Sequence, residues 1–411
     1  MKVDRCKGFK DLLPEEMVCF RLIEDTFRDR CLKWGYREVR TPTLEYLYLF
    51  TSVGTLTPGM LRRVYSFLDW DGWSGERVVL KPDGTIPVAR MYIENMAAQK
   101  IARLFYMTNV FMFDETGKKS RERWQCGAEL IGVNSPMADA ELIALAIEVL
   151  QKLGLKNIEL RISHAGLIKA LLAKLALSHS EQDRIFDQIL DGDREALARV
   201  NPDKPELVAA LTLLLDMKGR SSGFLKNVKA ILPQQIPEFE PCIDNFAAIC
   251  QIIENTGCDY RIDMALGKGF EYYTGIIFHL FSGEQNIGGG GRYDALIPLM
   301  GGQDTPAAGF ALYLDRLMKL VKQDITEEPM TKRILVSVAT GAEMPALAVA
   351  GKLREAGYIA ELAPGEEKMA GYGWLLKVRD KSPRFVLINK SSDRESAVES
   401  DSEVIDLLGC E

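Results

Sequence analysis

The chain has 411 residues, of which 47% are hydrophobic and 27% charged, and its formal net charge at pH 7 is −7. A chain of this size can bury more than one hydrophobic core, so two or three domains are expected. No stretch approaches the roughly 18 uninterrupted apolar residues of a membrane span, and acidic residues stand where a signal peptide has its apolar centre, which predicts a cytoplasmic protein without membrane contact.

Metal-ligating side chains are too sparse to predict a metal site. The 8 cysteines are scattered without a C-x-x-C pair, and the 3 histidines do not stand at a metal-ligand spacing. Reduced core thiols are therefore expected, with no metal and no cofactor. The acidic net charge gives no support to nucleic-acid binding, although it does not exclude a local basic patch.

The first part of the chain alternates helical and strand patterns. Apolar residues at helical spacing after Pro14 predict a helix from Glu15 to Leu32. The segment WGYREVRTP then predicts a strand that ends at Pro42, which cannot donate to a sheet ladder and therefore marks an edge or an interface. Further strands are predicted at Arg77–Lys81, Leu104–Phe113 and Cys126–Val133 and near Tyr272 and Gly289, with helices at Thr85–Ala98, at Asp139–Leu153 and from Ala307. This order predicts an α+β fold in which helices pack on one side of an antiparallel sheet.

Three further regions complete the predicted organisation. Leucine and alanine recur at helical spacing over about 168–256, which predicts a helical insert within a core that spans residues 1–323. The charged, proline-containing segment 324–332 is typical of a linker. Beyond it, residues 333–411 alternate strand and helix patterns, including a helix near Met369, which predicts a small α/β domain with a mainly parallel sheet.

Segments in the same order along almost the whole chain resemble the histidyl-tRNA synthetase family of class II aminoacyl-tRNA synthetases. They are GFKDLLPEE near the N-terminus, WGYREVRTPTLE, KPDGT, VFMFDETGKKSRERWQCGAELIG, GKGFEYYTGIIF, GGGGRYDAL and GFALYLDRL. The glycine run alone is a weak signal, because such runs are often bulges or close contacts between backbones. As a set, the segments imply a class II synthetase-like antiparallel sheet flanked by helices, a helical insert, and a C-terminal domain similar to the anticodon-binding domain of that family.

The resemblance implies a histidine-binding pocket built on strands and on the loop before a helix. Gln125 and Glu129 lie four residues apart, so in a strand they face the same side of the sheet, and Gly127 between them is expected to leave room for the ligand. Adjacent tyrosines in a strand point to opposite faces, so only one of the pair 272–273 is expected to line the pocket, and the resemblance to the family implies that it is Tyr273. The implied histidine-binding residues are Asp83, Thr85, Gln125, Glu129, Tyr272 and Tyr273.

Departures from the family pattern fall where the synthetase binds ATP. Met112 stands where the family has an arginine, and Asp114 stands where it has a glutamate, followed by a shortened loop. Lys268 replaces a second arginine, which keeps the charge but loses the planar two-donor fork. Arg316 of the third motif remains. Because cations must stabilise the charge at the α-phosphate, these changes predict a degenerate ATP site and no catalytic residues.

A histidine pocket combined with a damaged ATP site resembles the regulatory subunits of ATP phosphoribosyltransferase, which are themselves similar to histidyl-tRNA synthetases. That resemblance implies a homodimer that assembles with a short-form catalytic subunit in the first step of histidine biosynthesis, binds histidine and does not charge tRNA. Two alternatives stay open: a diverged, active histidine–tRNA ligase, and a stand-alone histidine or tRNA sensor. The C-terminal domain has slightly more acidic than basic residues, which favours a relic domain over an RNA-binding surface.

Overall fold

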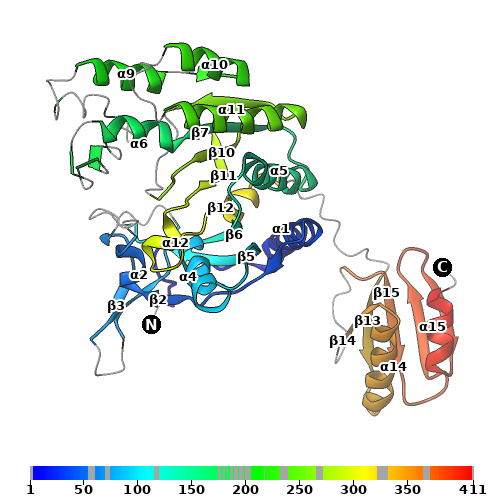
Figure 1. The fold of residues 1–411 in the computed structure, drawn as a ribbon. Helices are drawn as coiled ribbons and strands as arrows, with labels where there is room; N and C mark the ends of the chain where they lie inside the picture. The colour runs from blue at the N-terminus through cyan, green and yellow to red at the C-terminus, as the bar shows by residue number, and fades with distance from the viewer. Residues whose placement is uncertain are drawn as a thin grey trace. The chain divides into compact units, whose positions relative to one another are not determined.

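The computed structural model divides the chain into two compact units, Met1–Lys322 and Gln323–Glu411. It describes residues 3–53, 61–69, 75–114, 120–174, 205–216, 218–231, 239–264, 272–321, 332–363 and 371–409, together with isolated positions between 177 and 199. The predicted linker at 324–332 falls outside the described residues except for its last position. Each unit has a sheet and helices of its own (Figure 1).

A nine-stranded mixed sheet forms the centre of the first unit. Its order is β1 (Arg37–Glu38), β5 (Ala102–Phe111), β6 (Glu122–Ile131), β12 (Ala307–Tyr313), β11 (Gln285–Arg292), β10 (Ile276–Ser282), β7 (Ile158–His164), β9 (Tyr260–Asp263) and β8 (Lys218–Gly219). The run from β5 to β7 is antiparallel, as predicted. The pairs β1–β5 and β7–β9 are parallel, so the sheet is mixed toward its two edges.

The predicted helix from Ala307 is instead strand β12, which lies between β6 and β11 in the middle of the sheet. Its segment AAGFALY contains three alanines and one leucine, residues that favour helices in isolation. Both neighbouring strands pair with it along its length, and this tertiary environment overrides the local preference. Only the following four residues, α13 (Leu314–Leu317), are helical.

Helices cover one face of this sheet. Helix α1 (Pro14–Lys33) and helix α5 (Pro136–Lys152) lie side by side (Figure 1), and both pack on the central strands. The Phe27 ring of α1 contacts the rings of Phe105 on β5 and Phe310 on β12, with centroids 6.0 and 6.3 Å apart. Because successive strand residues alternate between faces, the odd-numbered residues of β6 point away from these helices. That opposite face is called the site face below.

A smaller sheet, in the order β2 (Leu44–Tyr46), β4 (Arg77–Leu80) and β3 (Ser66–Leu68), accompanies helix α2 (Leu47–Thr51). The strand predicted to end at Pro42 is shorter than expected, because β1 ends at Glu38. Strand β1 is an edge strand of the main sheet, as the proline indicated, and β2 begins two residues after the proline. Helix α4 (Thr85–Asn95) follows β4 and brings the KPDGT loop to the main sheet.

Residues 168–256, predicted as a helical insert, contain most of the helices α6 (Ala165–Ala173), α9 (Pro205–Asp216), α10 (Ser222–Ile231) and α11 (Phe239–Asn255). In Figure 1 these helices lie together beside β7, and α11 also packs on α5. A short helix, α12 (Leu296–Leu299), contacts α4. Among the residues that the structure describes, no helix combines the length and the apolar character needed to span a membrane.

The second unit has a five-stranded sheet in the order β14 (Ile359–Ala363), β13 (Arg333–Val338), β15 (Trp374–Val378), β16 (Phe385–Asn389) and β17 (Arg394–Val398). Strands β13, β14 and β15 are parallel, whereas β16 and β17 are antiparallel, so the sheet is mixed rather than mainly parallel. Helices α14 (Glu343–Glu355) and α15 (Asp401–Gly409) supply Val349, Leu353 and Val404 to a buried core of this unit. The helix predicted near Met369 lies outside the described residues.

Candidate functional site

Glu129 is the centre of a buried hydrogen-bond network on the site face. Its side chain is on β6, and the residue is only 1% exposed. Its carboxylate accepts hydrogen bonds from Thr85 Oγ1 at 2.8 Å, from the Tyr106 hydroxyl at 3.2 Å and from the Tyr293 hydroxyl. Burial raises the pKa of Glu129 to about 8, although the hydroxyl donors oppose that shift. The network holds one carboxyl group in a fixed position.

Asp83 and Thr85 flank Gly84, the residue directly before the first turn of helix α4, and both lie close to Glu129. Asp83 Oδ1 accepts a hydrogen bond from the backbone N–H of Ile86 at 2.9 Å, which places the carboxylate at the positive end of the helix. Burial raises the pKa of Asp83, and the backbone N–H groups of residues 84–86 partly oppose this. The structure therefore brings Asp83, Thr85 and Glu129 together, as predicted from the sequence.

Gln125 lies on the same face of β6 as Glu129 and is paired in register with Thr108 on β5 and Tyr313 on β12. Its Oε1 atom is buried and has no hydrogen-bond partner among the residues that the structure describes. An unmet buried carbonyl oxygen costs about 1–3 kcal/mol, so a bound donor at this position would be stabilised.

Tyr272 and Tyr273 both reach the site, which differs from the prediction that only one of them does. Neither is in a strand, because β10 begins at Ile276, so the alternation of strand side chains does not apply to them. Their rings contact each other with centroids 5.3 Å apart, and the Tyr272 ring also contacts Tyr293 at 5.5 Å. Burial raises the pKa of both phenols, and the nearby Glu129 carboxyl group adds to the shift when it is ionised.

Gly127 makes room for a protein side chain rather than for a ligand, contrary to the sequence interpretation. A β-carbon at this position would lie 2.3 Å from the Tyr106 ring and 2.4 Å from its hydroxyl oxygen. The glycine is therefore required so that Tyr106 can cross the strand and reach Glu129. Nothing in the sequence pattern indicates that Tyr106 belongs to the site. Tyr293 is part of the GGGGRYDAL motif, and this position could have identified it as a site residue.

The positions expected to form a degenerate ATP site are partly described. Met112 directly follows β5, and its backbone N–H donates to the Arg121 carbonyl at 2.9 Å. Because Val110 pairs with Arg123, Met112 continues the site face beyond the end of the strand. The Asp114 carbonyl accepts two hydrogen bonds from the Arg121 guanidinium, at 3.1 and 2.7 Å. Lys268 lies outside the described residues.

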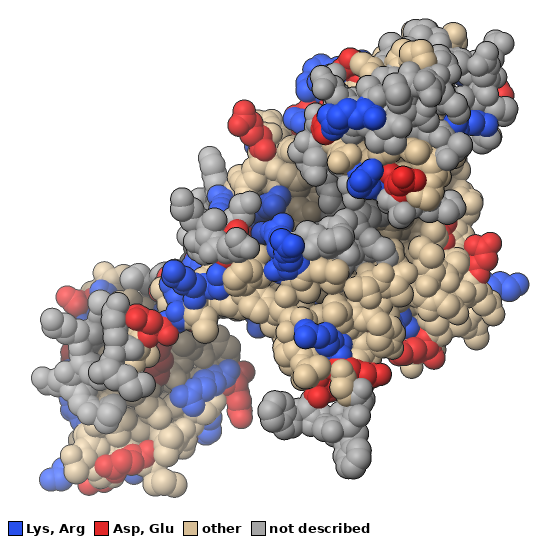
Figure 2. Space-filling model, turned by 90° about the vertical axis from the view of Figure 1, so that its left-hand side faces the viewer, with Lys and Arg blue, Asp and Glu red and all other residues tan. Residues whose placement is uncertain are grey.

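The guanidinium groups of Arg63 and Arg316 both lie close enough to Arg123 to act on its charge, and we call Arg63, Arg123 and Arg316 the Arg123 cluster. Burial lowers the pKa of Arg123, and the positive charges of Arg316 and Arg63 lower it further. Arg316 donates to the Asn286 carbonyl and lies 4.4 Å over the Tyr313 ring, while Arg63 Nε donates to the Phe113 carbonyl at 3.5 Å. Figure 2 shows Lys and Arg side chains close together in the middle of one face. Because Arg63 and Arg316 act on Arg123, the region around Arg123 keeps more positive charge than the loss of an arginine at Met112 suggests.

The arrangement can accept several hydrogen bonds from a small cationic ligand. Asp83, Glu129 and the Gln125 oxygen are acceptors, and the tyrosine rings supply apolar contact around them. No group of three or more side chains suited to hold a metal ion occurs in the described part of the chain. The Arg123 cluster adds donors for an anionic group beside the acceptors.

Comparisons with known proteins agree over most of the chain. The family model described as histidyl-tRNA synthetase matches residues 8–317. An ATP phosphoribosyltransferase regulatory subunit from Dehalococcoides mccartyi (strain BAV1) is 53% identical over 409 residues, which cover 100% of this chain and 99% of the relative. A histidine–tRNA ligase from Archaeoglobus fulgidus is 31% identical over 431 residues, covering 99% of this chain and 100% of the ligase.

A solved structure from Bacillus halodurans, described as an ATP phosphoribosyltransferase regulatory subunit/histidyl-tRNA synthetase, superposes with a TM-score of 0.76. It is 24% identical and covers 92% of this chain and 98% of its own, so it shows a shared fold. The fold, the matched segments and the full-length identity lead to one assignment. The chain belongs to the histidyl-tRNA synthetase family and, within it, to the group of the ATP phosphoribosyltransferase regulatory subunits.

Proposed function

We propose that this chain is the regulatory subunit of an ATP phosphoribosyltransferase in the first step of histidine biosynthesis, and that it supports a short-form catalytic subunit. The observation that carries the proposal is the 53% identity to a regulatory subunit over the whole length of both chains. The candidate ATP site supports it, because Met112 presents a thioether where a synthetase needs a cation. Activity then resides in the partner, and this chain contributes assembly and ligand response.

Histidine is the proposed ligand of the site around Glu129. Its ammonium group and its imidazole N–H need acceptors, which Asp83, Glu129 and the Gln125 oxygen supply. The rings of Tyr272 and Tyr273 supply the apolar wall against the imidazole. Thr85 holds the Glu129 carboxylate in place. As the end product of the pathway, histidine bound here would report its own abundance to the catalytic partner.

A second candidate is an active histidine–tRNA ligase, which the Arg123 cluster favours. Its guanidinium groups supply positive charge near the position where a synthetase stabilises the α-phosphate. The 31% identity to an archaeal ligase over the full chain is compatible with that reading. A histidine or tRNA sensor without a catalytic partner is the third candidate.

The proposed building block is a homodimer formed through the smaller sheet. Leu44 and Tyr46 on β2, Tyr48 on α2, and Phe67 and Leu68 on β3 are all exposed. The rings of Tyr46 and Tyr48 stack with centroids 5.5 Å apart, which keeps two large apolar surfaces in the same place. Leu44, Tyr46 and Phe67 share one face of this sheet, because Leu44 pairs with Leu80 and both Tyr46 and Phe67 pair with Val78. Large apolar side chains that are exposed on one face are typical of a protein–protein interface.

A mixing experiment separates the candidates. The purified chain is combined with a short-form ATP phosphoribosyltransferase catalytic subunit from the same genome, and the transferase rate is measured with and without histidine. The regulatory reading predicts a rate increase on mixing and a decrease on adding histidine. Histidine-dependent exchange between pyrophosphate and ATP by the chain alone would instead support the ligase. If neither response were seen, the sensor would be the remaining candidate.

Variants test the ligand site within the same assay. Glu129→Ala and Tyr273→Ala are expected to abolish the histidine response and the heat of histidine binding in calorimetry, while the rate increase on mixing persists. Glu284→Ala is the matched control, because this exposed glutamate lies in the β10–β11 turn. A folded Glu129→Ala protein that still binds histidine with unchanged affinity would contradict the assignment of the site.

A further inference from the structure

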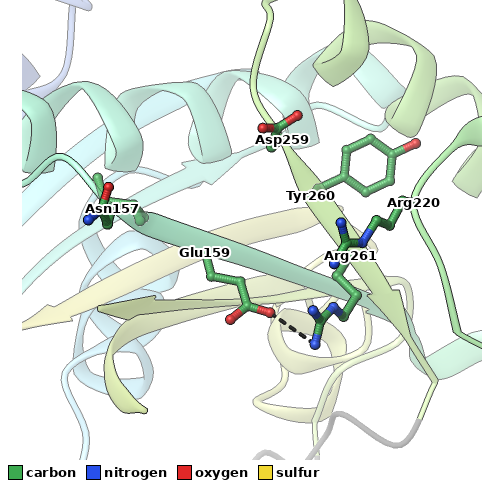
Figure 3. Close-up of a pocket in the computed structure, with 7 residues that line it drawn as sticks. Asn157, Glu159, Arg220, Asp259, Tyr260 and Arg261 are labelled. Carbon is green, nitrogen blue, oxygen red and sulfur yellow. Dashed lines mark ion pairs between the residues drawn. The ribbon is translucent and has the colours of Figure 1, made fainter. Parts of the chain in front are cut away.

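A second pocket lies near the other end of the main sheet, away from the Glu129 network in the strand order. It has a volume of about 390 Å³ and is lined by Asn157, Ile158, Glu159, Arg220, Asp259, Tyr260 and Arg261 (Figure 3). We call it the β9 pocket, because three of its residues surround the start of β9 and the others come from β7 and from the residue after β8. Neither the proposed regulation by histidine nor the candidate ATP site uses these residues.

Arg161 forms a two-point salt bridge with the Glu159 carboxylate on this side of the sheet. Its Nε and Nη2 atoms donate to the two carboxylate oxygens at 3.0 and 3.1 Å. The Arg161 guanidinium also lies 4.2 Å over the Phe281 ring on β10, which fixes its orientation. Glu159 is thereby engaged by a two-point bond to a residue that does not line the pocket.

Within the part of the chain that the structure describes, the guanidinium groups of Arg220 and Arg261 donate no hydrogen bond. The register pairs Gly219 with Ile262, so Arg220 follows directly beside Arg261 on the neighbouring strand. Arg261 Nη1 lies 3.4 Å from Glu159 Oε1 as an ion pair, and no hydrogen bond to either guanidinium occurs among the described residues. In Figure 3 both side chains extend toward the same space, and Asp259 lies apart from the Arg261 guanidinium. Each guanidinium carries five N–H donors.

We propose that the β9 pocket binds the phosphoryl group of a small phosphorylated molecule through Arg220 and Arg261. A phosphoryl group has three acceptor oxygens and up to two negative charges, so it can bridge two guanidinium groups, whereas one arginine already satisfies a carboxylate. The Glu159–Arg161 pair shows the latter case in the same place.

The size and lining of the pocket limit the rest of the ligand. A volume of about 390 Å³ is at the small end of ligand sites, which run from about 300 to 1,000 Å³. The aromatic lining residue, Tyr260, is buried and its hydroxyl donates to Glu254 at 2.7 Å, so it presents little ring surface for stacking a nucleobase. Asn157 and Asp259 are exposed polar groups at the pocket that can bind hydroxyl groups. A phosphorylated sugar fits this chemistry better than a nucleotide.

Calorimetry on the full-length chain tests the proposal, with ribose 5-phosphate, pyrophosphate and acetate as probes. Both phosphorylated probes are expected to bind and acetate is not. The double variant Arg220→Ala with Arg261→Ala is expected to weaken binding at least about tenfold, because it removes the charge-assisted hydrogen bonds from both guanidinium groups. Replacing both residues by lysine keeps the charge without the forked donors and is expected to give an intermediate loss.

Two controls make the result specific. Lys218→Ala with Arg77→Ala removes the same charge from exposed residues that do not line the pocket, and should leave binding unchanged. Arg123→Ala tests the other group of arginines that attracts anions. Absence of binding to the wild type, an equal loss in the Lys218 and Arg77 control, or a loss confined to Arg123→Ala would overturn the proposal. Histidine binding, measured on the same proteins, should be unaffected in the Arg220 and Arg261 variant, so the two sites fail or succeed separately.

Discussion

At the scale of single residues, Glu129 combines two opposing features. Burial favours its neutral form, whereas the hydroxyl groups of Thr85, Tyr106 and Tyr293 all donate to it. A buried polar network of this kind is stable when all its members are paired, and it then defines a unique side-chain arrangement. The site is therefore organised around this carboxyl group before a ligand arrives.

The pH dependence of the free energy of unfolding should reflect the protonation of Glu129. Its pKa is about 8 in the folded chain and 4.5 without perturbation, so between these values the folded state holds a proton that the unfolded state has released. Stability should then fall as pH rises through this window, by at most about 1.4 kcal/mol per pH unit from this group. Glu129→Gln should show a flatter dependence from pH 5 to 8 in urea unfolding. Parallel curves for wild type and variant, with Glu284→Gln as the control, would contradict the buried, proton-retaining carboxyl group.

Some residues of the site can be predicted from the sequence and others cannot, for physical reasons. Glu129 and Gln125 follow from the two-residue period of a strand, which the structure keeps. The positions of Tyr272 and Tyr273 do not follow from this period, because both residues precede strand β10. Their rings can therefore contact each other. Tyr106 was out of reach, since only the three-dimensional register shows that it crosses Gly127.

Met112→Arg should not restore synthetase chemistry. The wild type is expected to show no histidine-dependent exchange of pyrophosphate into ATP. The new guanidinium would join the Arg123 cluster, where positive charges already lower the pKa of Arg123, and it would repair only one of several sequence departures. Groups that act as a unit are not additive, so most of the barrier should remain, also in the double variant with Lys268→Arg. Exchange by the unmodified chain at about 1 s⁻¹ or faster would place it with the ligases.

At the scale of elements, the local sequence pattern correctly predicted the helices and strands that are stabilised mainly by residues within the element itself. Pro14 begins α1, and the alternation in β5 and β6 agrees with the structure within a few residues. Strand β12 and the parallel edge pairs were not predictable in this way, because residues distant in the sequence determine them. Several large apolar side chains of the smaller sheet and of helix α2 are exposed in the described part of the chain.

That smaller sheet is expected to mediate self-association. Sedimentation of the wild type at micromolar concentration should give a dimer, and Tyr48→Lys with Phe67→Lys should give a folded monomer, because it places charges on side chains that are 60% and 46% exposed. Met344→Lys with Leu347→Lys is the matched control, since these α14 residues are 76% and 53% exposed in the other unit. A wild-type monomer, or equal dissociation by both double variants, would exclude this interface.

At the scale of the whole molecule, the candidate ligand sites and the C-terminal unit occupy different parts of the sequence. All candidate residues for histidine and for the degenerate ATP site are in the first unit, Met1–Lys322. The second unit has its own buried core, formed by residues such as Ile334, Val336 and Leu376. A unit with its own core can fold independently, and an independent unit does not need to contribute to the ligand site.

Removal of residues 333–411 should therefore leave histidine binding intact. The first unit keeps the nine-stranded sheet and the Glu129 network, so its affinity for histidine in calorimetry should stay within about twofold of the full chain, a change of about 0.4 kcal/mol. Glu129→Ala in the shortened protein should abolish the heat, as in the full chain, which shows that the same site is measured. Circular dichroism provides the check that the shortened protein is folded. If that folded protein bound histidine more than tenfold more weakly, the second unit would have to take part in the site, and the interpretation of residues 333–411 as a relic domain would be wrong.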